Sequence, residues 1–252
     1  MPGRWWAEFG SDSLNGLVEQ ALRNNPDIET AQAALRQAAE NYIADTGQLY
    51  PQVHGNASLA RQRSATTGQA FDLFNASVGV SYLVDAFGGV QRSLEASAAT
   101  QETQRFHLEA TYLALTSNVI TAAIQEAALS AQIAALQDII TAQSQELDLL
   151  NQQFELGAVA RGDVLAQQSQ LASTQASLPP VQKQLEQVRN TLAILTGRLP
   201  AAGQVPSLEL ADLRLPPDLP LSVPSNLVHQ RPDIRASEAL LHSATANVGV
   251  AT

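Results

Sequence analysis

The side chains best suited to metal or acid–base chemistry are scattered along the sequence. A metal site needs several convergent ligands, and none of the four histidines has a carboxylate at a ligand-like spacing. The chain has no Cys, which excludes thiolate ligands and cysteine nucleophiles, and it has no Gly-x-Ser-x-Gly, phosphate-loop or His-Glu-x-x-His signature. The sequence therefore predicts no catalytic residue, no metal and no cofactor. The histidines are His54, His107, His229 and His242.

The composition argues against two further classes of protein. With 45% hydrophobic and 15% charged residues, the chain is too apolar for a disordered protein. Its formal charge of −10 leaves no basic stripe for phosphates, so we expect no nucleic-acid partner.

The best candidate site is a short interruption between two helical patterns, at residues 156–162. Gly157 supplies the backbone freedom that a tight turn between helices requires. Apolar residues at an exposed turn predict a surface for a partner protein. The polar residues beside them contact that partner or merely cap the turn. The predicted docking residues are Leu156, Gly157, Ala158, Val159, Arg161 and Asp163.

Two polar residues, Glu126 and Gln143, occupy otherwise apolar helical seams. They line a pore or set the register between helices, or else they lie on a solvated flank of the helix pair. The sequence leaves these alternatives open.

Two long helices must position the 156–162 turn. Residues 90–156 contain neither Gly nor Pro, so one helix of about 100 Å is possible. Its apolar residues recur in alternating steps of four and three over six heptads, and the pattern returns after Asp163, a predicted N-cap. The predicted structure is an antiparallel coiled-coil hairpin over 86–198, with a kink or short break at Pro179-Pro180.

The preceding segments predict helices and then strands. In residues 1–50 we expect a helix pair broken at Asn24-Asn25-Pro26. Over 51–85 the apolar residues alternate, as in two strands of a transmembrane barrel; an ordinary hairpin packed on the helices is the alternative. The residues predicted to face the membrane are Val53, Ala57, Leu59, Phe74, Ala76, Val78, Val80 and Tyr82.

The end of the chain repeats its beginning. Pro232-Asp233-Ile234 copies Pro26-Asp27-Ile28 after a Pro-rich linker at 199–224, and a short helix is expected at 225–229. Residues 225–252 therefore predict the start of a second structural repeat, so the chain reads as roughly half of a longer protein. No unbroken apolar run approaches the roughly 18 residues of a membrane helix, and no signal peptide is recognisable.

Several motifs together resemble a known family. Asp85-Ala86-Phe87-Gly88 follows the second strand, and the family usually has Trp-Glu-Leu-Asp-Leu-Phe-Gly where this sequence has residues 82–88. With Trp5-Trp6, Asn25-Pro26-Asp27 and the 192–197 segment Leu-Ala-Ile-Leu-Thr-Gly, these residues resemble TolC-like outer-membrane efflux proteins. The stretch from Arg231-Pro232-Asp233 to Ala251 is similar to the NodT-type subgroup, lipoprotein channels of RND pumps. Their acylated N-terminal Cys is missing here, so we expect no lipid anchor on this chain.

The resemblance implies a fold and a function. The expected fold is mainly α with a β-hairpin, and it forms half of a protomer. Family members are homotrimers that share a twelve-stranded barrel in outer-membrane lipid and extend an α-helical tunnel into the periplasm of a Gram-negative bacterium. They export small molecules, drugs included, passively; an inner-membrane transporter, here of the RND type, supplies energy, and a periplasmic adaptor docks at the helical tips. The alternative is a soluble periplasmic coiled-coil adaptor or interaction module.

Overall fold

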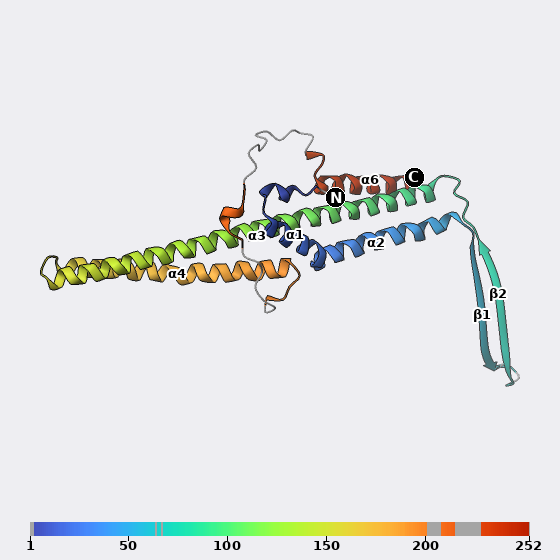
Figure 1. Ribbon diagram of the computed structural model, residues 1–252. Coiled ribbons are helices and arrows are strands. Elements are labelled where there is room, and N and C mark those ends of the chain that lie inside the picture. The colour runs from blue at the N-terminus through green and yellow to red at the C-terminus, as the bar shows by residue number, and fades with distance from the viewer. Residues whose placement is uncertain (1–2, 64, 67, 201–207, 215–227, 252) are drawn as a thin grey trace. The chain divides into compact units, whose positions relative to one another are not determined.

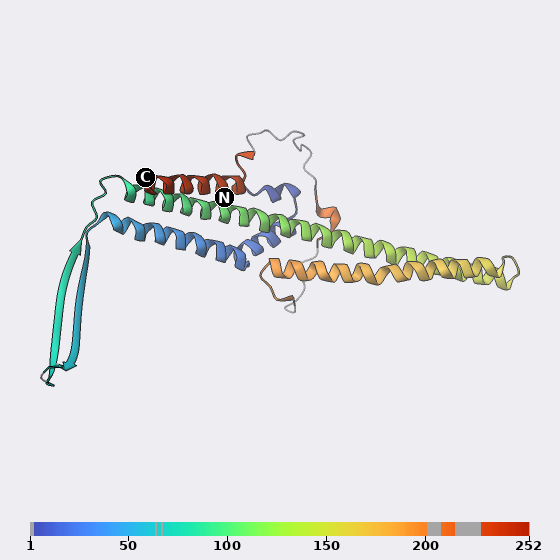
Figure 2. The ribbon, with the colours of Figure 1, turned by 180° about the vertical axis from the view of Figure 1, so that it is seen from behind.

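The computed structural model describes residues 3–63, 65–66, 68–200, 208–214 and 228–251. The chain forms two compact units, one of residues 1–30 and 109–223 and the other of residues 31–108 and 224–252. Two helices contribute to both units: α2 (Pro26–Thr46) and α3 (Gly89–Glu155). All elements are drawn in Figures 1 and 2.

The first unit is helical and has a well-defined core. Its other elements are η1 (Trp5–Phe9), α1 (Asp12–Asn24), α4 (Arg161–Leu195) and η4 (Leu210–Asp212). Ser11 caps α1, because its hydroxyl accepts a hydrogen bond from the Leu14 N–H. The buried face of α1 packs with the middle of α3 and the end of α4. This core includes Leu14, Val18, Val119, Ala123 and Leu192.

The predicted break after α1 is confirmed. Helix α1 ends at Asn24 and α2 begins at Pro26, with Asn25 in an extended conformation between them. The Asn25 side chain bonds in two directions: its Oδ1 accepts from the Asp27 N–H at 2.8 Å, and its Nδ2 donates to the Leu195 carbonyl at 3.0 Å. The junction therefore joins the start of α2 to the end of α4.

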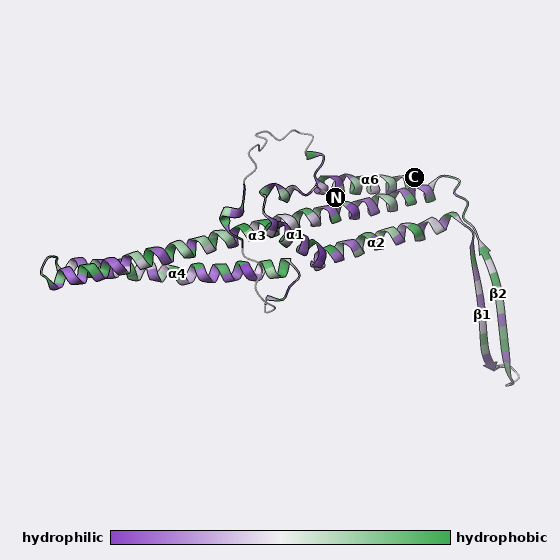
Figure 3. Cartoon of the chain, in the orientation of Figure 1, coloured by the Kyte–Doolittle hydropathy of each residue, from purple (hydrophilic) through white to green (hydrophobic). Residues whose placement is uncertain are grey.

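A long helical hairpin is present in the first unit, which contains residues 109–155 of α3 and all of α4. Helix α3 has 67 residues and α4 has 35, and hydrophilic and hydrophobic residues are interspersed along both (Figure 3). Of the kink or short break expected at Pro179-Pro180, the break is wrong, because α4 runs through both prolines, and the kink stays a prediction. The carbonyls that lose their donors belong to Gln175 and Ala176. Both residues are exposed, which makes the loss of these hydrogen bonds less unfavourable than in a buried helix.

Helix α3 is more apolar than the search for unbroken apolar runs suggests. Helix α3 contains an 18-residue window of mean hydropathy 1.4, of which 33% is buried, so by length and composition this helix is able to cross a membrane. A search for unbroken apolar runs misses such a window. Part of the apolar surface of α3 is used for packing, because Leu115, Val119 and Ala127 belong to the core of the first unit.

The second unit contains the strands. After α2 the chain forms η2 (Gly47–Leu49), β1 (Gln52–Arg63) and β2 (Ala70–Ser81), and it returns as α3. The two strands pair antiparallel as a two-stranded sheet. Asp85 caps α3, because its Oδ2 accepts from the Gln91 N–H at 3.1 Å.

Small residues join α3 to α6 (Pro232–Ala251) in the second unit. The Ser243 hydroxyl donates to the Ala96 carbonyl at 3.0 Å and lies 3.3 Å from the Thr100 hydroxyl. The Arg235 guanidinium lies 4.2 Å from the centre of the Phe106 ring, a cation–π distance. The repeated Pro-Asp-Ile sequence thus begins a helix in both places, α2 and α6.

Two expectations fall largely outside the described residues. The linker at 199–224 is described only at 199–200 and 208–214, where it contains η4 and the buried Leu208. The short helix expected at 225–229 is described only from Val228.

Candidate functional site

The turn between α3 and α4 is a Schellman motif. Gly157 has φ +75°, its N–H donates to the Phe154 carbonyl at 2.9 Å, and the Ala158 N–H donates to the Gln153 carbonyl at 2.8 Å. These two bonds satisfy carbonyls that the end of α3 leaves without partners. A side chain at position 157 would meet nothing within 4 Å. Only the backbone angle therefore requires glycine there.

The start of α4 corrects one prediction. Asp163 is not the N-cap: the helix begins at Arg161, after Ala160. Asp163 occupies the third helical position, where its Oδ2 accepts from the Ala160 N–H at 3.1 Å. The carboxylate also lies where the helix dipole favours an anion. Ala160 has no side chain that could cap the helix, so the sequence suggests Asp163 as the N-cap. The bond from the Ala160 N–H to the Asp163 carboxylate does not need a capping side chain at position 160.

The tip presents apolar side chains to solvent. Leu156 is 85% exposed, and Phe154 and Leu165 on the flanking helices are 41% and 53% exposed. Of the other predicted residues, Val159 is half-buried, and Gly157, Ala158, Arg161 and Asp163 are exposed. The structure thus brings the predicted docking residues together in one turn, with Leu156 the most exposed large side chain.

The strand pairing gathers the predicted membrane-facing residues on one face. Directly paired residues of an antiparallel sheet lie on the same side, and the pairs are apolar with apolar: Val53 with Val80, Ala57 with Ala76, and Leu59 with Phe74. Val78 pairs with Gly55. The opposite face carries the pairs Gln52–Ser81, His54–Gly79, Asn56–Ser77 and Ser58–Asn75.

The strands are exposed on both faces. In β1 every residue except Ala60 is exposed, and in β2 every residue except Gly79. The alternative of a hairpin packed on the helices therefore does not hold in this structure. Tyr82 is the exception among the predicted residues, because β2 ends at Ser81 and Tyr82 lies just beyond it.

The apolar face ends in a charged pair. Arg61 and Asp72 are directly opposite each other on that face, with 3.8 Å between Nε and Oδ1. Nearer the turn the pattern inverts, because Phe71 and Leu73 lie on the other face. The apolar band thus occupies the part of the hairpin that adjoins the helices in the chain.

Glu126 is a buried charge on the α3–α4 seam, so for this residue the solvated-flank alternative is wrong. It is 3% exposed, and its Oε1 accepts from Nε and Nη2 of Arg189 on α4, at 3.1 and 3.0 Å. Burial opposes the charged form of Arg189, but hydrogen bonds to Glu126 and Glu186 outweigh this effect and raise its pKa. Gln143 contributes its backbone carbonyl, which accepts from Gln167 at 3.4 Å.

Sequence reasoning missed one titratable pair in the second unit. His242 Nε2 lies 2.8 Å from Glu95 Oε1, and the hydrogen bond from His242, with a further one from Arg92, lowers the pKa of Glu95. The two partners are separated by 147 residues, so only the α3–α6 packing reveals them. Within the described part of the chain, no three potential ligands gather as a metal site.

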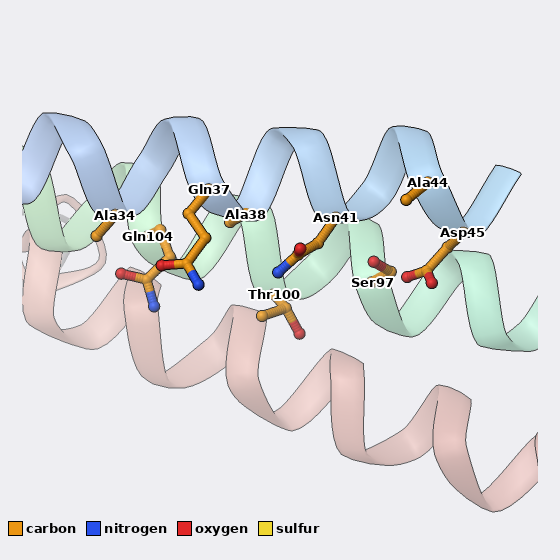
Figure 4. Close-up of a pocket in the computed structure, with 9 residues that line it drawn as sticks. All are labelled: Ala34, Gln37, Ala38, Asn41, Ala44, Asp45, Ser97, Thr100 and Gln104. Carbon is orange, nitrogen blue, oxygen red and sulfur yellow. The ribbon is translucent and has the colours of Figure 1, made fainter.

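A groove of about 530 Å³ lies in the second unit (Figure 4). Its lining combines alanines with amide, hydroxyl and carboxylate side chains, spaced by three and four residues along α2 and α3. This spacing is visible in the sequence and permits close approach of another helix. The groove is lined by Ala34, Gln37, Ala38, Asn41, Ala44, Asp45, Ser97, Thr100 and Gln104.

Comparison with known proteins identifies the family. The model of a family described as outer membrane efflux protein matches residues 17–198, more than half of the chain. The chain belongs to the outer membrane efflux protein family. The resemblance noted in the sequence is thereby confirmed, and so is the predicted fold class, a helical hairpin with a β-hairpin.

Relatives in the outer membrane efflux family match nearly the whole chain. The pyoverdine export outer membrane protein OpmQ of Pseudomonas putida is 31% identical, over 98% of this chain and 55% of its own. The cation efflux system protein CusC of Escherichia coli K12 is 29% identical, over 98% and 54%. The solved structure of the outer-membrane channel OprN superposes with a TM-score of 0.85 at 30% identity, over 98% and 57%. The chain spans about half the length of these relatives.

Proposed function

We propose that the full-length protein is the outer-membrane channel of a tripartite efflux pump in a Gram-negative bacterium. It is a passive conduit for small molecules and performs no bond chemistry. As the family resemblance implies, three copies share a barrel and a periplasmic tunnel, a periplasmic adaptor docks at the helical tips, and an inner-membrane transporter of the RND type supplies the energy.

The register of β1 and β2 is the observation that carries this proposal. It places the predicted apolar residues of both strands on one exposed face. Each strand has 12 residues, and a tilted strand needs about 9–11 to cross a bilayer. Two strands leave open edges, which lipid does not tolerate. We infer that further strands, from the rest of the protein and from other copies, close the barrel.

The helical hairpin supports the second part of the proposal. Within the first unit, residues 109–155 of α3 extend for about 70 Å at 1.5 Å per residue, which suits a tunnel that reaches into the periplasm. At its end the exposed Leu156 and its neighbours offer an apolar surface, which fits an adaptor.

The relatives leave the exported compound open. OpmQ is named for pyoverdine export and CusC for cation efflux, so one fold serves unlike cargoes. We assign only small molecules, antibiotics among them, as the class of substrate.

The alternative, a soluble periplasmic adaptor or interaction module, shares the helical hairpin but not the need for lipid-facing strands. A matched pair of variants in the full-length protein separates the two. In V78K a charge replaces an apolar residue on the apolar face, whereas in S77K the same charge lies on the polar face. A charge on a lipid face is unfavourable by about 2–4 kcal/mol at the bilayer midplane.

We expect V78K to lower the amount of trimer in the outer membrane, and export with it, whereas S77K assembles normally. The measurements are gel mobility of the unheated trimer and accumulation of an exported dye. Normal trimer levels in the outer membrane for both variants would count against a lipid-facing strand face, and recovery of both from the periplasm without detergent would favour the soluble alternative.

A further inference from the structure

The buried pair Glu126–Arg189 has a consequence for the hairpin as a whole. Glu126 lies 29 residues before the end of α3, and Arg189 lies 28 residues after the start of α4. The pair is thus about 42–44 Å from the tip along both helices. These two distances are nearly equal, so Glu126 and Arg189 face each other in only one axial alignment of α3 and α4.

The apolar seam does not define that alignment. Its residues recur every three and four positions along both helices, so a slip of one heptad would again place apolar residues opposite apolar residues. After such a slip the residue opposite Glu126 would be the neutral Thr196 instead of Arg189. The carboxylate would remain buried without its counter-charge, which is strongly unfavourable.

The turn sequence also permits a second alignment. A slip of one heptad moves the turn by three to four residues, from about position 158 into the 161–162 region. Gly162 lies there, in the first turn of α4, where an added Cβ would meet nothing within 4 Å outside the helix itself. A glycine inside a helix is unfavourable, whereas after a helix end it is favoured. The structure uses the turn at Gly157, and Gly162 lies one or two residues beyond position 160 or 161, which would take the place of Gly157 after the slip.

We propose that Glu126 and Arg189 are a register lock: a positioning pair that, together with the anchored C-terminal end of α4, holds α4 in one axial register against α3 and so decides which residues form the tip. Their burial within the hairpin argues against the pore-lining role that the sequence left open. The effect of the lock on export rests on the proposed function of the tip, whereas the register itself does not.

The register is measurable by cross-linking, because the chain has no natural Cys in residues 1–252. Gln167 Nε2 donates to Glu146 Oε2 at 2.9 Å across the hairpin, so the pair E146C/Q167C reports the native register. The pair E146C/T174C reports a slip of one heptad, because residue 174 lies about 10 Å further along α4. A short bismaleimide and mass spectrometry of the linked peptides detect each pair in the full-length, membrane-embedded protein.

Each reporter pair is combined with four variants at or beside the lock, of which R189K keeps the charge of residue 189. The double variant E126L/R189L removes both charges and keeps the seam apolar, a replacement that often leaves stability intact. E126Q removes the charge of residue 126 but keeps the side-chain volume. It replaces the double variant in the experiment if E126L/R189L does not accumulate in the membrane. E186Q is the matched control, because Glu186 bonds to the same guanidinium at 3.0 Å but is exposed.

With Glu126 and Arg189 in place we expect only the native cross-link. In E126L/R189L, and to a smaller extent in E126Q, the slipped cross-link rises by about tenfold or more, whereas E186Q behaves as the parent. R189K, which keeps the charge, restricts cross-linking to the native pair. A native-only pattern in both E126L/R189L and E126Q would overturn the lock. If the register slips as expected while export stays normal, the lock stands and the proposed role of the tip fails.

Discussion

The C-terminal ends of α3 and α4 share a backbone motif but differ in their surroundings. Each helix ends in a Schellman motif around a glycine of positive φ, Gly157 at +75° and Gly197 at +71°. A Cβ at Gly157 would meet open space, whereas a Cβ at Gly197 would lie 2.8 Å from the Cβ of Asn24 and closer still to its carbonyl oxygen. The first glycine only permits a turn. The second also permits two backbones to touch.

The side chains beside the two glycines also differ in their exposure. The residue before Gly197, Thr196, is fully buried, and polar contacts from Gln20, Asn25 and Arg198 hold that helix end in the core of the first unit. The residue before Gly157, Leu156, is 85% exposed. The same glycine motif therefore ends both helices, but the end of α4 is fixed in the core, whereas the end of α3 exposes a surface to a partner.

The largest expected effect on stability is that of G197A. The alanine combines an unfavourable positive φ with a clash against the Asn24 backbone, so we expect a loss of about 2–4 kcal/mol. Thermal unfolding of the detergent-solubilised, full-length protein measures it. A midpoint equal to that of the parent would show that the close approach at Gly197 is not needed.

Asn25→Ala removes the cap of α2 and the bond to the Leu195 carbonyl. We expect a loss of about 2 kcal/mol, roughly half from each interaction. The same unfolding assay applies, with Asn25→Ser as its control, because Ser retains a capping oxygen but not the donor to the Leu195 carbonyl and therefore recovers about half of the loss.

G157A has a smaller effect, because only the backbone angle is unfavourable. We expect about 1 kcal/mol, clearly below the loss in G197A. The two variants are measured side by side, and equal losses would contradict the distinction between the two helix ends.

Leu156→Glu is expected to leave the unfolding midpoint unchanged, because the side chain is exposed. Export is expected to fall several-fold if the tip docks an adaptor, since a charge would enter an apolar contact. Leu156→Met keeps the apolar surface and serves as the control. Normal export by the Glu variant, with normal trimer levels, would count against docking through Leu156.

The sequence was sufficient for features with a local cause. The helix break before Pro26, the alternation of the strands and the glycine turn at 157 each follow from residues close together in the chain. The strand prediction was inexact at both ends of the hairpin: Tyr82 lies beyond the last pair, Gln52–Ser81, and β1 continues to Arg63, into residues that the polar pattern assigns to the loop.

Features that depend on distant residues were not predictable. Glu126 was recognised as unusual, but its partner lies 63 positions away, and pairing them requires the register of the hairpin. The prolines of α4 were expected to kink or interrupt the helix, and no interruption occurs, because the local rule takes no account of how exposed that part of the helix is. Asp163 was assigned to the wrong capping position because its contact with the Ala160 N–H is made backwards along the chain.

The most direct test of the proposed conduit is lipid contact by the strand face. A single cysteine at Val78 or at Ser77 in the full-length protein, labelled with a fluorophore and reconstituted in bilayers of brominated lipid, reports which face meets the acyl chains. We expect strong quenching at position 78 and little at position 77, because the two side chains lie on opposite faces of β2. Equal quenching at both positions, or none at position 78, would contradict it.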